Sequence, residues 1–569
     1  NRLAEPACRT GHRTVPIAGP AAVCLRILGR RADTLGMVES SGASESQAIA
    51  RRASVVASGT LISRILGAVR DAVIAACFPV NGTDAFFVAF TIPNSLRVIL
   101  GEGAVASAFI PVFSESKEKQ GRERARAFYG ALTGSMLLIL AAAAALGMLL
   151  AEPLVTLYAA GFRDEPGKFE TTVYLTRLLF PYLFFVGAAA LGMGALNALR
   201  RFFVPAFAPA LLNLSLIVAP FAFVPLALGW GMPALAGLGI GVLVGGLLQA
   251  AVQLPALGRA GMAPRPRIAF GDPGVRKVLR LMAPLMLAVG VYQINVMLTR
   301  LFASYLPSGS QSYLYYGQRL VEIPQGMFAL AIASASLPSL ADLRNRGEHD
   351  QAKQTFAYGI QLSLFVAIPS SILLAVLAGP VVTVLFERGA FGGLQAAETA
   401  RSLVWMAAGV WAIAAVRGVV QMYFAYNDTR TPVLCSALNL VVFAGLSLLL
   451  MQPMRHLGIA AATSGAAVVQ LGALLLLLRR RIGAYPLAPL ARCARRCALA
   501  GCLAAAGAHA LSGLGRWERG GNDPRNIAVL LGCMLLAAFL YLLMARLLRS
   551  PELDDLLRLL RGRRQGEAP

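Results

Sequence analysis

The most regular feature of the chain is a series of long apolar stretches separated by short polar or charged turns. A membrane-spanning helix needs about 20 mainly apolar residues, and fourteen such stretches follow one another along the chain. Their first residues are Ala53, Thr83, Ala127, Thr171, Phe203, Pro233, Lys277, Gln311, Thr355, Ala400, Thr431, Gly458, Ala494 and Ile527. The pattern predicts an all-α polytopic membrane protein with fourteen transmembrane helices.

An internal repeat divides these stretches. At an offset of 227 residues, three pairs of segments match: Gly82–Phe86 with Gly309–Tyr313, Ser107–Pro111 with Ser334–Pro338, and Pro205 with Pro432. The offset spans six helices, which predicts two pseudo-symmetric six-helix lobes in the same orientation, an arrangement common in transporters. The lobes are residues 51–258 and 259–481, and residues 482–550 add two further helices. A duplication retained only for packing is the other interpretation.

The two ends of the chain differ from the rest. Residues 1–50 contain no apolar stretch long enough to span a membrane, and we expect this extension to be disordered or a translation artefact, with Met37 as an alternative start. Residues 551–569 form a basic tail with Leu and Arg at helical spacing. Such a tail can lie on an anionic membrane surface or be an ordinary solvated end.

Composition and charge agree with a membrane protein. Of 569 residues, 57% are hydrophobic and 14% charged, and the mean hydropathy is +0.65. These values exclude a soluble globular enzyme, a disordered protein and a fibrous one. The net charge of +24 would indicate nucleic acid in a soluble protein. Here the loops of one side hold 29 Lys and Arg against seven on the other. The positive-inside rule places the basic side and both termini in the cytoplasm, so the charge implies no nucleic-acid partner.

Known catalytic motifs are absent from the sequence. The eight cysteines and four histidines are scattered, and there is no phosphate-binding G-x-x-x-x-G-K-[ST] loop, H-E-x-x-H or G-x-S-x-G motif. We therefore predict no catalytic residues, no metal site and no cofactor. A polytopic enzyme is disfavoured, because the extracytoplasmic loops are short and hold no evident catalytic cluster.

Four arginines lie inside predicted spans: Arg64 and Arg70 in the first, Arg97 in the second and Arg319 in the eighth. A central arginine costs about 2.5–3.5 kcal/mol on insertion scales, so we expect these side chains to face a water-filled cavity or acidic partners. The candidate partners are Asp71, Asp84, Glu102 and Glu322. Since guanidinium groups suit phosphate and carboxylate, a cationic cavity between the lobes predicts an anionic, phosphate-bearing substrate. Structural ion pairs or snorkelling side chains are the other interpretation.

Prolines interrupt the same two spans. Pro93–Asn94 lies in the second, and Pro324 lies at a nearby depth in the eighth. Irregular backbone within the membrane is tolerated where it lines a cavity, and it can also serve as a hinge. An ordinary proline kink is equally compatible with the sequence.

These residues carry a family resemblance. Ser63-Arg64-Ile65-Leu66-Gly67 with Arg70-Asp71 opens the pattern, followed by Thr83–Phe90, Pro93-Asn94, Arg97, Gly101–Ala104, Val204–Pro209 with Leu212-Asn213, and Tyr315-Tyr316 with Arg319, Glu322 and Pro324. The set resembles the MurJ (MviN) lipid II flippases, of the multidrug/oligosaccharidyl-lipid/polysaccharide exporter superfamily. The resemblance runs from about Ala53 to Arg481 and more faintly to the end.

The resemblance implies a transporter, not an enzyme. It implies movement of undecaprenyl-pyrophosphate-linked peptidoglycan precursor between the leaflets of the cytoplasmic membrane by alternating access. Arg64, Arg70, Arg97 and Arg319 would bind the substrate, supported by Ser63, Asp71, Asp84, Asn94, Glu102 and Glu322, and the last two helices would form a groove for the lipid tail. The implied partners are lipid II, membrane lipids and cell-wall synthesis proteins.

Two alternatives remain open at this point. A flippase for another undecaprenyl-linked glycan could use a similar cationic cavity, so charge alone does not separate it from a lipid II flippase. A scaffold for cell-wall assembly would leave the four arginines without a role.

Overall fold

The computed structural model describes residues 41–102, 104–325 and 339–555, and in this part of the chain the regular structure is helical throughout. The first helices are α2 (Ser41–Cys77), α3 (Val80–Arg97), the π-helix η2 (Val98–Glu102), α4 (Ala104–Leu149), α5 (Ala151–Ala159), the 3₁₀ helix η3 (Ala160–Asp164), α6 (Lys168–Leu179), α7 (Tyr182–Ala198), α8 (Phe203–Gly229), α9 (Ala234–Ala251) and α10 (Gln253–Arg259). Helix α4 is two helices joined at Gly121, whose backbone is non-helical.

A second set follows in the same order. It consists of α11 (Pro273–Ser304), α12 (Ser310–Pro324), α14 (His349–Val376), α15 (Ala378–Phe386), α16 (Gly393–Ala407), α17 (Val410–Ala425), α18 (Arg430–Met454) and α19 (His456–Ile482). After it come α20 (Leu487–Ser512), the 3₁₀ helix η5 (Trp517–Arg519) and α21 (Pro524–Leu547).

Helix boundaries repeat at the offset found in the sequence. Helices α5 and α15 begin and end 227 residues apart, as do the starts of α8 and α18 and the ends of α2 and α11. The matched prolines occupy the third position of α8 and of α18. Ser334–Pro338 lies outside the described residues. These boundaries support the division into two lobes, which stays a prediction.

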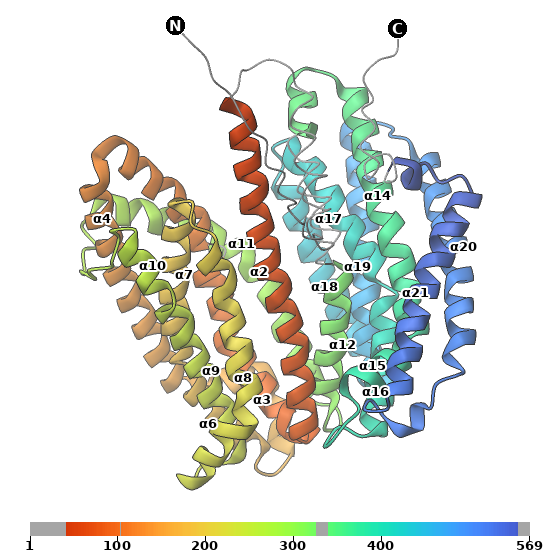
Figure 1. Cartoon of the computed structure of the whole chain (residues 1–569), viewed down its shortest axis with the longest axis horizontal. Coiled ribbons are helices and arrows are strands. Elements are labelled where there is room, and N and C mark those ends of the chain that lie inside the picture. Colours follow the sequence, from red (N-terminus) through yellow and green to blue (C-terminus); the bar gives the residue numbers. More distant parts are fainter. Residues whose placement is uncertain (1–40, 103, 326–338, 556–569) are drawn as a thin grey trace, which may run out of the picture.

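The helices pack in two groups with a few helices between them. Figure 1 shows α2 standing between a group that contains α4 and α6–α10 and another that contains α14–α21. Helix α2 packs on α8, α3 packs on α6 and α12, and α20 packs on α14 and α21. Helix α11 contacts α4 of the first group and α18 of the second. The helices α2, α3, α11 and α12 are therefore where the two groups meet.

Most helices suit a membrane. In the described part of the chain, ten helices are long and apolar enough to span a bilayer, or eleven when the bent α11 counts as one span. An all-helical, multi-pass architecture is confirmed, whereas fourteen spans stay a prediction. Helices α2, α12 and α20 are not among the ten. The first two carry Arg64, Arg70 and Arg319, so the predicted spans least suited to lipid hold the candidate site.

The two ends of the bundle differ in charge. The end formed by the start of α4, the α7–α8 turn and the segment between α10 and α11 holds Lys117, Arg122, Arg201, Arg259 and Arg265 among others, and we call it the basic end. The opposite end, where α2 gives way to α3 and α11 to α12, is called the far end. In Figure 1 the far end is at the bottom.

Candidate substrate-binding site

Arg70 of α2 is almost fully buried and has a partner for each of its three nitrogens. Nε and Nη2 donate to Oδ1 of Asp71 at 2.9 and 2.6 Å, and Nη1 donates to Oδ1 of Asn213 on α8 at 2.9 Å. Nη2 also lies 3.3 Å from the hydroxyl of Tyr315 on α12. The Asn213 amide in turn donates to the Ser63 carbonyl at 2.8 Å. Arg70 thus connects α2 with α8 and with the second helix group.

Arg319 approaches the same carboxylate from α12. Its Nη1 donates to Oε2 of Glu322 at 2.9 Å, and its Nε lies 3.8 Å from Oδ2 of Asp71. Asp71 is 3% exposed, whereas the Arg319 side chain keeps 38% of its surface accessible. Asp71 therefore neutralises two arginines from two helices, and only Arg319 presents much of its guanidinium to a ligand.

Tyr315 is the centre of this cluster. Its hydroxyl accepts hydrogen bonds from Arg70 and, at 3.1 Å, from Nη2 of Arg319. One ring stack with Phe87 has a centroid distance of 3.8 Å, while the guanidinium carbons of Arg319 and Arg300 lie 4.9 and 5.7 Å from the ring centre. Cations are attracted to an aromatic face at such distances. A single tyrosine therefore gathers three arginines.

The cluster keeps an excess of positive charge. Arg70, Arg300 and Arg319 are opposed by Asp71 and Glu322, and Arg300 binds the Gln311 side chain and carbonyl at 3.2 and 3.4 Å instead of an acid. Arg64 is exposed and forms no hydrogen bond or ion pair with the described residues. Seven residues before Asp71, it lies on the same face of α2, about 10 Å nearer the basic end.

Arg97 lies where α3 becomes a π-helix. Its Nε donates to Oδ1 of Asn94 at 2.8 Å, and α3 contains Pro93 one turn earlier. Short π-helical segments often occur at functional sites. The side chain of Glu102 lies outside the described residues. The two helical interruptions predicted at Pro93 and Pro324 differ, because Pro93 lies within a continuous α-helix and Pro324 ends α12.

Asp84 does not partner an arginine, so this part of our sequence interpretation was wrong. Its carboxylate is 1% exposed and caps α12 from the neighbouring α3. Oδ2 accepts from the Gly309 amide at 2.6 Å, and Oδ1 accepts from the amide and hydroxyl of Ser312 at 2.8 and 2.7 Å. Carboxylates are favourable at helix N-termini, where free amides and the helix dipole meet. Gly309 has a φ of 98°, a conformation that favours glycine.

Lys168 completes this polar contact at the far end. Its ammonium lies 3.2 Å from Asp84, 3.0 Å from Glu165 and 2.8 Å from the Ser308 hydroxyl, and it sits over the Phe162 ring. The Thr83 and Ser312 hydroxyls add a bond of 2.7 Å between α3 and α12. The far-end latch, defined as Thr83, Asp84, Lys168, Gly309 and Ser312, therefore joins the two helix groups through buried polar contacts.

Sequence analysis missed three contributors. Lys168 was counted only as a charge in a loop, Arg300 was not selected, and the Tyr315 hydroxyl entered only as part of a motif. The distance of Arg300 from the centre of its span gave no signal. The helical spacing of Tyr315 and Arg319, four residues apart, would have placed both side chains on one face.

Metal binding has no visible basis in the part of the chain that the structure describes. Within residues 41–102, 104–325 and 339–555, no three His, Cys, Asp or Glu side chains are grouped to hold an ion. The candidate site therefore consists of guanidinium groups, two carboxylates and a phenol. Such a set binds anions through charge-assisted hydrogen bonds.

Comparison with known proteins agrees with this arrangement. The family model described as "Lipid II flippase MurJ" matches residues 74–521. The probable lipid II flippase MurJ of Bdellovibrio bacteriovorus is 36% identical over 466 residues, covering 81% of this chain and 88% of that protein. The lipid II flippase MurJ of Burkholderia cenocepacia is 34% identical over 451 residues, covering 77% and 85%.

Solved structures show the same fold. A lipid II flippase MurJ in an inward closed conformation has a TM-score of 0.72 at 23% identity, covering 88% of this chain and 99% of that one. An inward-facing multidrug-resistance MATE transporter of the MOP superfamily has a TM-score of 0.62 at 13% identity, covering 75% and 97%. The fold is therefore that of a multi-pass membrane transporter of this superfamily type.

Within that class, the chain belongs to the lipid II flippase MurJ family. The family resemblance drawn from the sequence motifs is confirmed. The family consists of transporters, and the chain is not an enzyme.

Tyr315 and its neighbour Tyr316 provide a matched test of the cluster. Tyr315→Phe keeps the ring but removes the acceptor of Arg70 and Arg319, so we expect a loss of about 1–3 kcal/mol in the free energy of unfolding. The Tyr316 hydroxyl is buried with no hydrogen-bond partner among the described residues, so Tyr316→Phe should be neutral or stabilising. Thermal unfolding of the purified variants measures both. Equal stability of the two variants would contradict a role for the Tyr315 hydroxyl.

Proposed function

We propose that this chain is a lipid II flippase. It moves the undecaprenyl-pyrophosphate-linked peptidoglycan precursor from the inner to the outer leaflet of the cytoplasmic membrane by alternating access. Family membership supports the substrate class, because the relatives carry that name. The single structural observation that carries the proposal is the cluster of Arg70, Arg300 and Arg319, located where α2 and α12 meet between the two helix groups.

The arginines divide into two kinds. Arg70 is buried and occupied by Asp71, Asn213 and Tyr315, so its role is to hold the others in place. Arg64 is exposed, and Arg319 is partly so, which leaves their guanidinium groups able to contact a pyrophosphate. Arg97, on the opposite side of α2's partner helices, adds a further positive charge. A pyrophosphate bound by these groups would satisfy the positive charge that Asp71 and Glu322 leave unbalanced.

The far-end latch supplies the closed side of the transport cycle. Asp84 and Lys168 join α3 and α6 to the start of α12 at the far end, while Arg64 lies toward the basic end. Opening the far end requires the carboxylate to leave its amide and hydroxyl donors. A substrate drives that change only if it binds the open-outward state more tightly than the inward one. In our proposal, release of the latch is coupled to phosphate binding through α12, which carries both Ser312 and Arg319.

The orientation follows from charge. We propose that the basic end faces the cytoplasm and that residues Ser41 and Leu547, both at that end of their helices, lie on the cytoplasmic side. External labelling of a single cysteine placed at either position in intact cells would contradict this orientation. We also propose that α20 and α21 contact the lipid tail, since Leu499, Leu503, Leu535 and Phe539 keep about half or more of their surface exposed.

Alanine variants of the arginines test the substrate proposal. We expect Arg64→Ala, Arg97→Ala and Arg319→Ala each to lower lipid II flipping roughly 10- to 100-fold, because each loses charge-assisted bonds worth about 1.5–3 kcal/mol. Arg70→Ala should have an effect at least as large, since it leaves Asp71 buried with one partner fewer. Growth of a bacterium depleted of its own lipid II flippase, at matched membrane levels of each variant, measures the outcome.

The control is Arg346→Ala, which removes an exposed loop arginine. Rescue by wild type and by this control, but not by the cluster variants, supports transport through the cationic cluster. Rescue by every variant would refute the arginine mechanism. Failure of well-expressed wild type, combined with flipping of another undecaprenyl-linked glycan in vesicles, would favour that alternative substrate.

A cross-link across the far-end latch tests alternating access. The Thr83 and Ser312 hydroxyl oxygens are 2.7 Å apart, so Thr83→Cys with Ser312→Cys should form a disulfide in a background without native cysteines. We expect oxidation to abolish flipping in vesicles and reduction to restore it, because the far end can no longer open. Each single cysteine variant is the control and should respond to neither reagent. Flipping at the wild-type rate by fully cross-linked protein would rule out opening at this end.

A further inference from the structure

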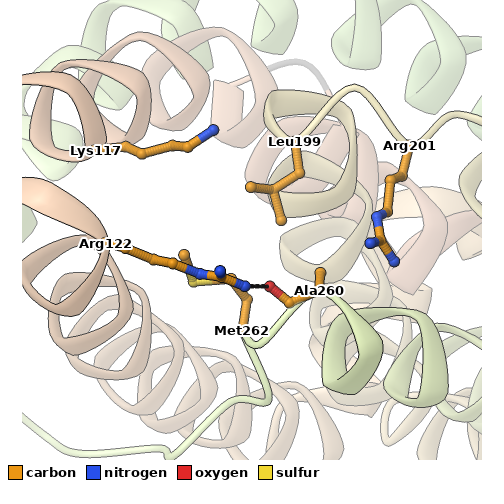
Figure 2. A pocket seen from close by; sticks show the side chains of 6 residues that line it. All are labelled: Lys117, Arg122, Leu199, Arg201, Ala260 and Met262. Atoms are coloured by element: carbon orange, nitrogen blue, oxygen red, sulfur yellow. Dashed lines mark hydrogen bonds between the residues drawn. The ribbon is translucent and has the colours of Figure 1, made fainter.

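A second cationic site lies at the basic end, away from the cluster of α2 and α12. Figure 2 shows a pocket lined by Lys117 and Arg122 of α4, Leu199 and Arg201 of the α7–α8 turn, and Ala260 and Met262 of the turn after α10. Its volume is about 240 Å³. Three segments that are far apart in the sequence therefore converge on one depression, and each of them contributes either a cation or the backbone that holds one.

The three cations of this pocket have no acidic partner among the described residues. Arg122 donates to the Ala260 carbonyl, and Nη1 of Arg201 donates to the Ala256 carbonyl at 3.4 Å. The nearby carboxylates are already occupied by other cations: Glu115 binds Lys119 and Lys277, and Asp272 binds Arg124. No carboxylate lines the pocket. Its charge is therefore left for a ligand that bears negative charge.

The pocket is shaped by the backbone. Gly121, with a φ of 83°, interrupts α4 immediately before Arg122. Gly261 has a φ of 65°, and a Cβ there would lie 2.5 Å from Nη2 of Arg122. Glycine at position 261 thus allows the guanidinium to lie across the turn and bind the Ala260 carbonyl. The direction of Arg122 is consequently set before any ligand arrives, which lowers the entropic cost of binding.

The depth of the pocket indicates a lipid ligand. The apolar spans that contribute to it end at Ala198 and at Arg259, directly before Leu199 and Ala260, and the next span begins at Phe203. Phe203 is 68% exposed and stacks parallel to Phe207 one turn further along α8. A cationic depression at the edge of the apolar band, continued by exposed aromatic rings along the outer face, matches a phosphate headgroup followed by an acyl chain.

We propose that this pocket binds the phosphodiester headgroup of an anionic phospholipid, with the acyl chains lying along Phe203 and Phe207. Lys117, Arg122 and Arg201 contact the phosphate, and Leu199 with Met262 forms the apolar floor. The bound lipid connects α4, the α7–α8 turn and the segment before α11. This site takes a membrane phospholipid independently of the substrate that the helix groups transport.

Calorimetric titration of the purified full chain tests the proposal. The probe is dihexanoyl-phosphatidylglycerol, with dihexanoyl-phosphatidylcholine and inorganic phosphate as comparison ligands. Loss of the three charges in Lys117→Gln/Arg122→Gln/Arg201→Gln should weaken phosphatidylglycerol binding about tenfold or more, since each cation near an anionic headgroup contributes to affinity. Lys117→Glu alone, at an exposed side chain with no contact to lose, should weaken it in the same direction.

The matched control removes the same charge elsewhere at the basic end. Arg346→Gln/Arg479→Gln/Arg480→Gln alters three exposed arginines of the second helix group and should leave binding unchanged. Equal binding by the pocket and control variants would overturn the site, as would binding of phosphatidylcholine as tight as that of phosphatidylglycerol. Inorganic phosphate binding as tightly as the lipid would identify a free-anion site and overturn the lipid assignment.

Discussion

Burial of Asp71 beside Arg70 is the interaction on which the centre of the molecule depends. An ionised side chain within an apolar bundle is costly unless it is paired and hydrogen-bonded. Arg70 meets that condition with three partners from α2, α8 and α12. Removing any one of them leaves a buried charge incompletely satisfied, so the network holds these helices in one arrangement. The same requirement explains why α2 and α12 meet here and not through a continuous apolar seam.

Positive charge left over by that network gives the site its chemistry. Tyr315 places three guanidinium groups around one ring, and only two carboxylates oppose them. The far-end latch solves the opposite problem, because Asp84 is a buried anion that requires donors from both helix groups. Both clusters share α12. A displacement of this helix therefore changes the anion-binding groups and the latch together, which is the physical coupling that alternating access needs.

The duplicated architecture places these clusters without itself being symmetric in charge. Helices α2 and α11 end 227 residues apart, yet the buried pair of Arg70 and Asp71 occurs only in α2, while Arg300 stands alone in α11. The repeat thus provides two similar scaffolds, and the differences between them produce a site at their junction. Further charges at the basic end, in the pocket of Lys117, Arg122 and Arg201, belong to one helix group alone.

The sequence by itself determined the helical, membrane-embedded class, the repeat, the family and the arginines of interest. These properties depend on periodicity, apolar length and local motifs, all of which are written along one strand of chain. Partnership between charges was decided only by the tertiary structure. Asp84 was expected near an arginine, but it caps α12 because the two helix groups bring residues more than 200 positions apart into contact. Lys168 and Arg300 gained their importance in the same way, since a side chain's partner depends on which helix faces it, and no local pattern records that.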